Sequence, residues 1–210
     1  MNDIFNEDCI KGMNRIENES IDLIITDPPY GVLPKGKGVD KFKWDNIDLI
    51  PFTKEWFNIA YQKLSNDSFM FIFWSQKYFK EGFDIFHPNR VIFWRYNNLI
   101  NGGGGDFAYD YEPIFVIKKG NPKLIKGKHS CDLEFTKPQS NFKKDKLIHP
   151  TQKPLELIKH LIAICQKNDI VLDCFMGSGT TAKACIVLNK NFIGFEKDTV
   201  YYEDSITRLK

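Results

Sequence analysis

Short apolar runs alternate with stretches of helical periodicity along the 210 residues of the chain. Runs of five to seven residues, rich in Ile, Phe and Val, have the length and composition of buried strands; they are residues 22–26, 68–74, 90–94, 113–117, 169–173 and 191–195. Apolar residues at helical spacing fall between them, in residues 52–64, 76–86, 154–166, 180–188 and 199–209. Several strands are apolar throughout instead of alternating, which is typical of a sheet covered by helices on both faces. The pattern predicts an α/β fold with a mainly parallel sheet.

Three segments interrupt this alternation. No helical pattern separates residues 90–96 from residues 111–118, so we expect these two strands to form an antiparallel pair at one edge of the sheet. Residues 31–45 and 101–106 have the glycine-rich composition of loops. Residues 120–147 are polar and rich in lysine, and we interpret them as an insertion into a single domain that spans residues 1–210.

The composition excludes several classes of protein. With 42% hydrophobic residues, the chain can bury one sizeable core, which a disordered segment cannot. No apolar run approaches the roughly 20 residues that a membrane span needs, and the N-terminus lacks the pattern of a signal peptide. The five cysteines never form Cys-x-x-Cys, and His149 has no second ligand at useful spacing, which disfavours a disulfide framework and a metal site. We therefore expect a cytoplasmic protein with no metal and no membrane segment.

The charge is unevenly distributed. The chain has 29 basic and 27 acidic residues, a formal net charge of +2. Residues 118–153, however, hold ten lysines against three acidic residues. Such a segment favours either a surface that binds a polyanion or a solvated lysine-rich loop, and the charge alone supports both interpretations equally.

The tetrad Asp27-Pro28-Pro29-Tyr30 directly follows the strand at residues 22–26. Ligands of open α/β sheets bind at the carboxyl ends of strands, so the tetrad lies where a reaction would occur. An exocyclic base amine is a poor nucleophile, and its hydrogens could be accepted by the Asp27 carboxylate and the Pro28 carbonyl. The prolines would fix the turn, and the Tyr30 ring could stack on a base swung out of the duplex. The tetrad thus suits methylation of a base amine; the alternative is a plain turn that ends a strand.

A glycine turn within residues 173–181 joins a strand to the start of a helix. Gly177 and Gly179 let the backbone approach a ligand closely, and the helix N-terminus favours negative charge. Glu196 ends the next strand, 17 residues after Gly179, where a carboxylate can hold ribose hydroxyls. This arrangement predicts a nucleoside cofactor, although a glycine turn can also serve tight packing alone. A dinucleotide oxidoreductase is disfavoured because the third glycine of its motif is absent.

The segment His149-Pro-Thr-Gln-Lys153-Pro154 precedes a helix that Pro154 opens well, and Lys153 could meet a carboxylate or a phosphate. With the tetrad, the basic segment, residues 149–154 and the glycine turn in this order, the chain resembles the beta class of amino DNA methyltransferases, the N4/N6 methylase family. The resemblance covers nearly the whole chain. One departure is Cys174, which stands where the family usually has proline.

The resemblance implies a Rossmann-like class I methyltransferase fold, a seven-stranded sheet circularly permuted so that the catalytic half is N-terminal. It implies S-adenosylmethionine as cofactor, double-stranded DNA as substrate, and residues 120–147 as a candidate target-recognition insertion. The tetrad Asp27, Pro28, Pro29 and Tyr30 would be catalytic. The residues that would bind the cofactor are Asp8, Cys9, Lys153, Asp173, Phe175, Gly177, Gly179, Thr180 and Glu196.

An aspartate at the start of the tetrad resembles adenine-N6 enzymes, since cytosine-N4 relatives more often begin with serine. The resemblance therefore implies site-specific adenine-N6 DNA methylation, as in restriction-modification systems. The alternatives are a cytosine-N4 or RNA adenine methyltransferase with the same machinery, and a non-catalytic methyltransferase-like partner subunit. A homodimer is one assembly that the resemblance allows.

Overall fold

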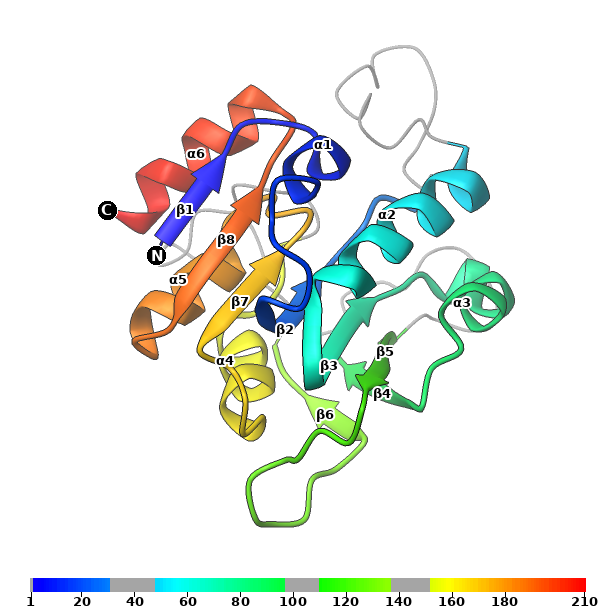
Figure 1. The fold of residues 1–210 in the computed structure, drawn as a ribbon. Coiled ribbons are helices and arrows are strands. Elements are labelled where there is room, and N and C mark those ends of the chain that lie inside the picture. The colour runs from blue at the N-terminus through cyan, green and yellow to red at the C-terminus, as the bar shows by residue number, and fades with distance from the viewer. Residues whose placement is uncertain (1, 31–47, 97–109, 137–151) are drawn as a thin grey trace.

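The computed structural model describes residues 2–30, 48–96, 110–136 and 152–210. Within these residues an eight-stranded sheet has the order β1-β8-β7-β2-β3-β5-β4-β6 (Figure 1). The strands are β1 (Asn2–Phe5), β2 (Ile21–Thr26), β3 (Leu64–Phe73), β4 (Arg90–Arg95), β5 (Tyr111–Lys119), β6 (Asp132–Glu134), β7 (Ile170–Asp173) and β8 (Asn191–Phe195). All six predicted strands are present, with ends shifted by a few residues.

The sheet is parallel except for one reversed strand. β5 pairs antiparallel with β3 on one side and with β4 on the other, while β4 and β6 pair in parallel. The predicted antiparallel pair is therefore confirmed, but it does not form the edge of the sheet, because β6 lies outside it. The edge strands β1 and β6 raise the number of strands above the seven that the resemblance implied. Both escaped prediction because they have only four and three residues and little apolar sequence.

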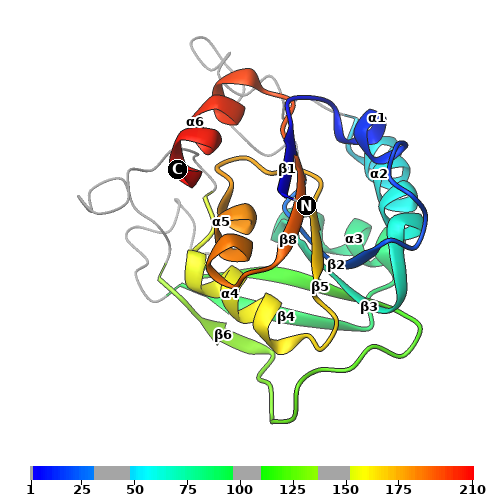
Figure 2. The same ribbon diagram turned by 60° about the vertical axis from the view of Figure 1, so that its left-hand side comes forward.

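The helices of the described residues cover both faces of the sheet (Figure 2). One face carries α1 (Cys9–Met13), α2 (Leu49–Lys63) and α3 (Phe79–Phe86), which follows a short 3-10 turn at Gln76–Tyr78. The other face carries α4 (Leu155–Ile164), α5 (Thr180–Val187) and α6 (Thr199–Leu209). The five predicted helices are confirmed. No helix among the described residues is long and apolar enough to cross a membrane.

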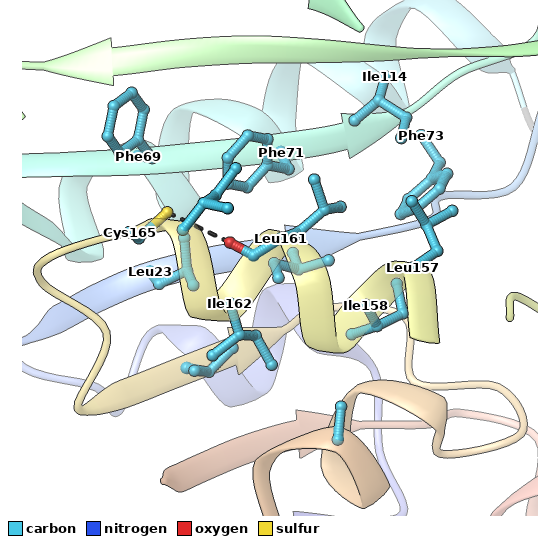
Figure 3. Close-up of a cluster of buried hydrophobic side chains, with 14 of the residues drawn as sticks. Leu23, Phe69, Phe71, Phe73, Ile114, Leu157, Ile158, Leu161, Ile162 and Cys165 are labelled. Atoms are coloured by element: carbon cyan, nitrogen blue, oxygen red, sulfur yellow. Dashed lines mark hydrogen bonds between the residues drawn. The ribbon is translucent and has the colours of Figure 1, made fainter. Parts of the chain in front are cut away.

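The central strand β3 shows why the apolar runs do not alternate with polar residues. Phe69, Phe71 and Phe73 pack into the core on the side of α4, where Leu157 and Leu161 meet them (Figure 3). The residues between them, Met70, Ile72 and Trp74, pack into the second core with α2 and α3. Because both faces are covered, every position along the second half of the strand is buried.

The lysine-rich segment leaves β5 at the amino-terminal edge of the parallel strands. Lys119 lies opposite Ser68, early in β3, and its Nζ contacts Glu19 Oε1 at 3.1 Å. Leu124 then bridges to Cys165 just after the end of α4. Figure 1 shows this green loop at the lower end of the sheet, away from the arrowheads of β7 and β8.

Candidate active site

The tetrad and the glycine turn lie side by side at the carboxyl ends of two neighbouring strands. β2 pairs with β7 through Ile24 and Leu172, so Asp27 follows β2 close to the point where Asp173 ends β7. After β2 the chain continues to β3 on one side of this pair, and after β7 it continues to β8 on the other side, so the order of the strands reverses between β2 and β7. Open α/β sheets bind ligands at such a switch point.

Lys153 connects the tetrad to the reversed strand. Its Nζ lies 2.6 Å from Asp27 Oδ2 and 2.9 Å from Glu112 Oε1, and its side chain is only 9% exposed. The Tyr30 hydroxyl donates to the other oxygen of Asp27, Oδ1. The Tyr96 hydroxyl donates to Glu112 Oε2 at 3.3 Å. We call Tyr30, Asp27, Lys153, Glu112 and Tyr96 the lysine network.

Burial and neighbouring charges set the protonation states in the lysine network. Burial alone would lower the pKa of Lys153, but the charges of Asp27 and Glu112 outweigh it and raise the pKa. Burial, followed by the charge of Asp27, raises the pKa of Tyr30 well above its usual value. Lys153 is therefore an ammonium and Tyr30 a neutral phenol, and both donate to Asp27. A carboxylate has about four lone-pair sites, so each Asp27 oxygen retains acceptor capacity for a further donor.

Aromatic rings form the wall behind the tetrad. The Tyr30 ring meets the buried Trp74 ring edge-on at 5.4 Å, and Trp74 Nε1 donates to the Tyr78 carbonyl at 2.7 Å. Lys153 Nζ lies 5.0 Å from the centre of the Phe73 ring. These apolar surroundings exclude water from the ion pairs and strengthen them.

The glycine turn is held in place by Glu196. Gly177 and Gly179 have φ angles of 50° and 72°, a region that other residues rarely adopt. The Gly177 amide donates to Glu196 Oε2 at 2.8 Å, and the Asp198 amide donates to Oε1 at 2.8 Å. Burial raises the pKa of Glu196. Each carboxylate oxygen still has a lone pair to offer a ligand.

Residues 6–9, which include the predicted cofactor residues Asp8 and Cys9, follow β1 next to Glu196, because β1 pairs with β8 up to Phe5 and Phe195. Asn6 Nδ2 donates to the Glu196 carbonyl at 2.9 Å. Asp8 Oδ1 accepts from the Ile10 amide and caps α1, while Oδ2 contacts Lys197 Nζ at 3.1 Å. Asp8 therefore caps α1 and is joined by an ion pair to Lys197, one residue after Glu196.

Other predicted cofactor residues have side chains that are engaged within the protein. The Cys9 thiol is buried in the core below α1, so a contact with a cofactor would fall to its backbone. Thr180 Oγ1 accepts from Arg208 Nη1 at 3.0 Å, and Phe175 packs edge-on against Trp56 at 5.4 Å. The binding roles of these residues remain predictions. Arg208, which also donates to the Ser178 carbonyl at 2.9 Å, had no sequence signal beyond its charge.

A family model described as DNA methylase matches residues 21–207. The chain belongs to this family. The methylase is 28% identical to the type II methyltransferase M.HinfI of Haemophilus influenzae, over all of this chain and 68% of that protein. It is 30% identical to M2.MboI of Moraxella bovis, over 98% of this chain and 86% of that protein.

Solved structures agree with this assignment of the methylase. The crystal structure of the M1.HpyAVI–SAM complex is 29% identical, with a TM-score of 0.74 and both chains fully covered. The cytosine-N4-specific PvuII DNA methyltransferase is 16% identical with a TM-score of 0.77, over 99% of this chain and 86% of that one. At that low identity the second match shows the fold alone. The methyltransferase fold that the sequence predicted is confirmed.

The fold of the methylase brings most predicted site residues to one edge. Asp8, Glu196 and Asp27 follow β1, β8 and β2, and Asp173 ends β7, which lies between β8 and β2. Lys153 joins them from the segment before α4, with its ammonium already occupied by Asp27 and Glu112. The sequence analysis did not predict three residues of the site: Glu112, Tyr96 and Trp74. The sequence marks each of them only as a polar or aromatic residue at the end of an apolar strand.

The lysine-rich segment, His149 and the predicted loops of the methylase lie away from the site or outside the described residues. Residues 118–125 lie at the edge opposite the site, which favours the solvated-loop interpretation for that part of the lysine-rich segment. Its second half, from residue 137, and His149 lie outside the described residues, as do the predicted loops at 31–45 and 101–106. In the ranges that the structure does describe, no three His, Cys, Asp or Glu side chains are grouped so as to hold a metal ion.

Asp173 should make the stability of the methylase depend on pH. Burial raises its pKa from 3.8 to about 7, against the bonds donated by Thr181 and the Phe175 amide. The unfolded chain then loses the proton at lower pH than the folded chain, so stability falls as pH rises from about 4 to about 7, by up to about 4 kcal/mol. Asp173→Asn should remove this decrease.

Urea unfolding of the cofactor-free protein at several pH values measures the effect. Asp204→Asn, an exposed position on α6, is the control and should keep the wild-type dependence. Equal pH dependence in the wild type and Asp173→Asn would contradict the assignment.

Proposed function

We propose that the chain transfers a methyl group from S-adenosylmethionine to N6 of adenine in double-stranded DNA. The observation that carries this proposal is the position of Asp27, at the switch point beside the glycine turn, with both carboxylate oxygens fixed by Tyr30 and Lys153. A fixed acceptor at this position can receive a hydrogen of the base amine without reorganising during the reaction.

The residues at the carboxyl ends of β1, β7 and β8 fit the proposed cofactor. Glu196 and Asp8 offer carboxylate oxygens to the hydroxyls and adenine of a nucleoside, and the left-handed turn at Gly177 and Gly179 lets the backbone approach it closely. When bound, S-adenosylmethionine supplies an electrophilic methyl group. The structure of the similar M1.HpyAVI with SAM supports this assignment.

The residues of the chain would act on the amine and on the base. Asp27 accepts an amine hydrogen and draws the nitrogen towards a tetrahedral, nucleophilic geometry, helped by the predicted Pro28 carbonyl. Tyr30 would have two tasks: its ring would stack on the base, while its hydroxyl, which donates to Asp27, orients the carboxylate. The rate enhancement would come mainly from positioning and from fixed acceptors around the amine.

Adenine as the target rests on the aspartate that begins the tetrad. Incubation of the protein with DNA and labelled S-adenosylmethionine, followed by nucleoside analysis, tests it. N6-methyl-2′-deoxyadenosine supports the proposal, and N4-methyl-2′-deoxycytidine would overturn the choice of base. A homodimer, a cytoplasmic location and a target-recognition role for residues 120–147 remain predictions.

Asp27→Asn should abolish turnover while cofactor binding persists. Asparagine keeps the shape but replaces one acceptor oxygen by a donor and loses the charge, so the loss should appear in the rate, by about 10²-fold or more. Single-turnover methylation with saturating DNA measures it, beside Asp22→Asn as a control at the opposite end of β2. A near-normal rate in Asp27→Asn would refute the role of Asp27.

Glu196→Gln should weaken binding of S-adenosylmethionine in the absence of DNA. The amide retains one acceptor oxygen but loses the charge-assisted bonds, each of which contributes about 1.5–3 kcal/mol, so affinity should fall by about 10- to 100-fold. Calorimetry measures it, with Glu203→Gln on the exposed side of α6 as the matched control. Unchanged affinity in Glu196→Gln would remove Glu196 from the cofactor site.

Replacing Lys123, Lys126 and Lys128 together with glutamine should leave DNA binding unchanged. These lysines are exposed at the edge of the sheet opposite Asp27, so they cannot contact DNA that presents a base to the tetrad. The dependence of log affinity on log salt should keep its wild-type slope. A slope lower by about one for each lysine would show that this loop does follow the phosphate backbone.

A further inference from the structure

The lysine network contains two carboxylates, Asp27 and Glu112, but only one ammonium, that of Lys153. Lys153 Nζ contacts Asp27 Oδ2 at 2.6 Å and Glu112 Oε1 at 2.9 Å, and these carboxylates are 20% and 16% exposed. Together the three side chains carry a single surplus negative charge. Asp27 and Lys153 alone would form a neutral pair.

A surplus charge in such a place is unfavourable for folding. Removing a carboxylate from water has a large desolvation cost, which one ammonium shared between two acids offsets only in part. The Tyr96 hydroxyl gives Glu112 one further hydrogen bond, at 3.3 Å. A neutral residue at position 112 would serve packing equally well. The presence of a charged Glu112 therefore suggests a role in the reaction.

The proposed reaction supplies that reason. The amine lone pair forms the new N–C bond, the C–S electron pair stays on sulfur, and the nitrogen is left with one proton too many. Asp27, which receives the amine hydrogen bond, is the acceptor in place for that proton. Once Asp27 is protonated, however, it no longer neutralises Lys153, and an unpaired buried ammonium is strongly unfavourable.

We propose that Glu112 is a positioning residue that keeps Lys153 neutralised while Asp27 holds the proton released from the base amine. The lysine network thereby has capacity for one proton: it goes from one surplus negative charge to none. Without Glu112, the Lys153 ammonium would bind Asp27 alone and oppose its protonation. This inference rests on the proposed function and adds a role for the reversed strand β5, which carries Glu112.

Three variants test the inference: Glu112→Gln, Lys153→Met and the double variant. The amide of Glu112→Gln can still offer its oxygen to Lys153, so the geometry is kept and only the charge is lost. Single-turnover methylation should slow by about 10-fold or more. The double variant restores one surplus negative charge, on Asp27, and should be several-fold faster than Glu112→Gln. Glu134→Gln, an exposed acid on β6 next to Arg95, is the control and should keep the wild-type rate.

A second measurement needs neither cofactor nor DNA. If Glu112 is a surplus acid, thermal unfolding of Glu112→Gln at pH 8 should occur at or above the wild-type midpoint, because a buried charge has been removed. If Glu112 only anchors Lys153, the unfolding midpoint of Glu112→Gln should fall by several degrees. In that case, adding Lys153→Met to Glu112→Gln should not restore activity.

Any one of three results would overturn the inference: a wild-type rate in Glu112→Gln, a double variant no faster than Glu112→Gln, or a lowered midpoint of Glu112→Gln. Failure of the proposed function is distinguishable, because the wild type itself would then transfer no methyl group to DNA.

Discussion

The ion pair between Lys153 and Asp27 joins segments that are 126 residues apart in the chain. Asp27 belongs to the end of β2, and Lys153 to the segment that enters α4, so the pair forms only when both halves of the sheet have met along β2 and β7. The same ammonium reaches Glu112 on β5. In the low-dielectric surroundings of Phe73 this contact is strong, and the orientation of the tetrad depends on it.

The backbone next to this lysine also connects the catalytic end to the cofactor end. Thr180 Oγ1 lies 3.5 Å from the Lys153 carbonyl and bonds Arg208 on α6, which in turn holds Ser178. From the other side, Glu196 holds the Gly177 amide. The glycine turn is therefore fixed by two elements that lie after it in the chain, although its left-handed residues would leave it adaptable in isolation.

The apolar pattern predicted the central strands and five of the described helices, because their buried positions form continuous or periodic runs. It did not predict the five-residue helix α1, nor β1 and β6, in which Ile4 and Leu133 reach the core from between polar residues and the strands are completed by pairing with β8 and β4. The tetrad and the glycine turn were found because their chemistry lies in consecutive residues. Glu112 was not found from the sequence, because its role depends on a contact with Lys153, 41 residues later, and on the reversed direction of β5. For the lysine-rich segment, charge left two interpretations open, and the direction of β5 places residues 118–125 at the edge away from Asp27.

Acidic side chains accumulate along the carboxyl edge of the sheet, and they influence one another. Burial raises the pKa of Asp173 first, and the charges of Asp27 and Glu196 raise it further. Glu112 adds to the same field, and Lys153 balances only part of it. Such a group of acidic side chains favours a cationic ligand over a neutral one of the same shape. S-adenosylmethionine carries a sulfonium, an ammonium and a carboxylate, and so is a net cation, whereas its demethylated product has no net charge. The same acids that make the empty site unfavourable for folding would therefore bind the methyl donor more tightly than the product, which helps the product to leave.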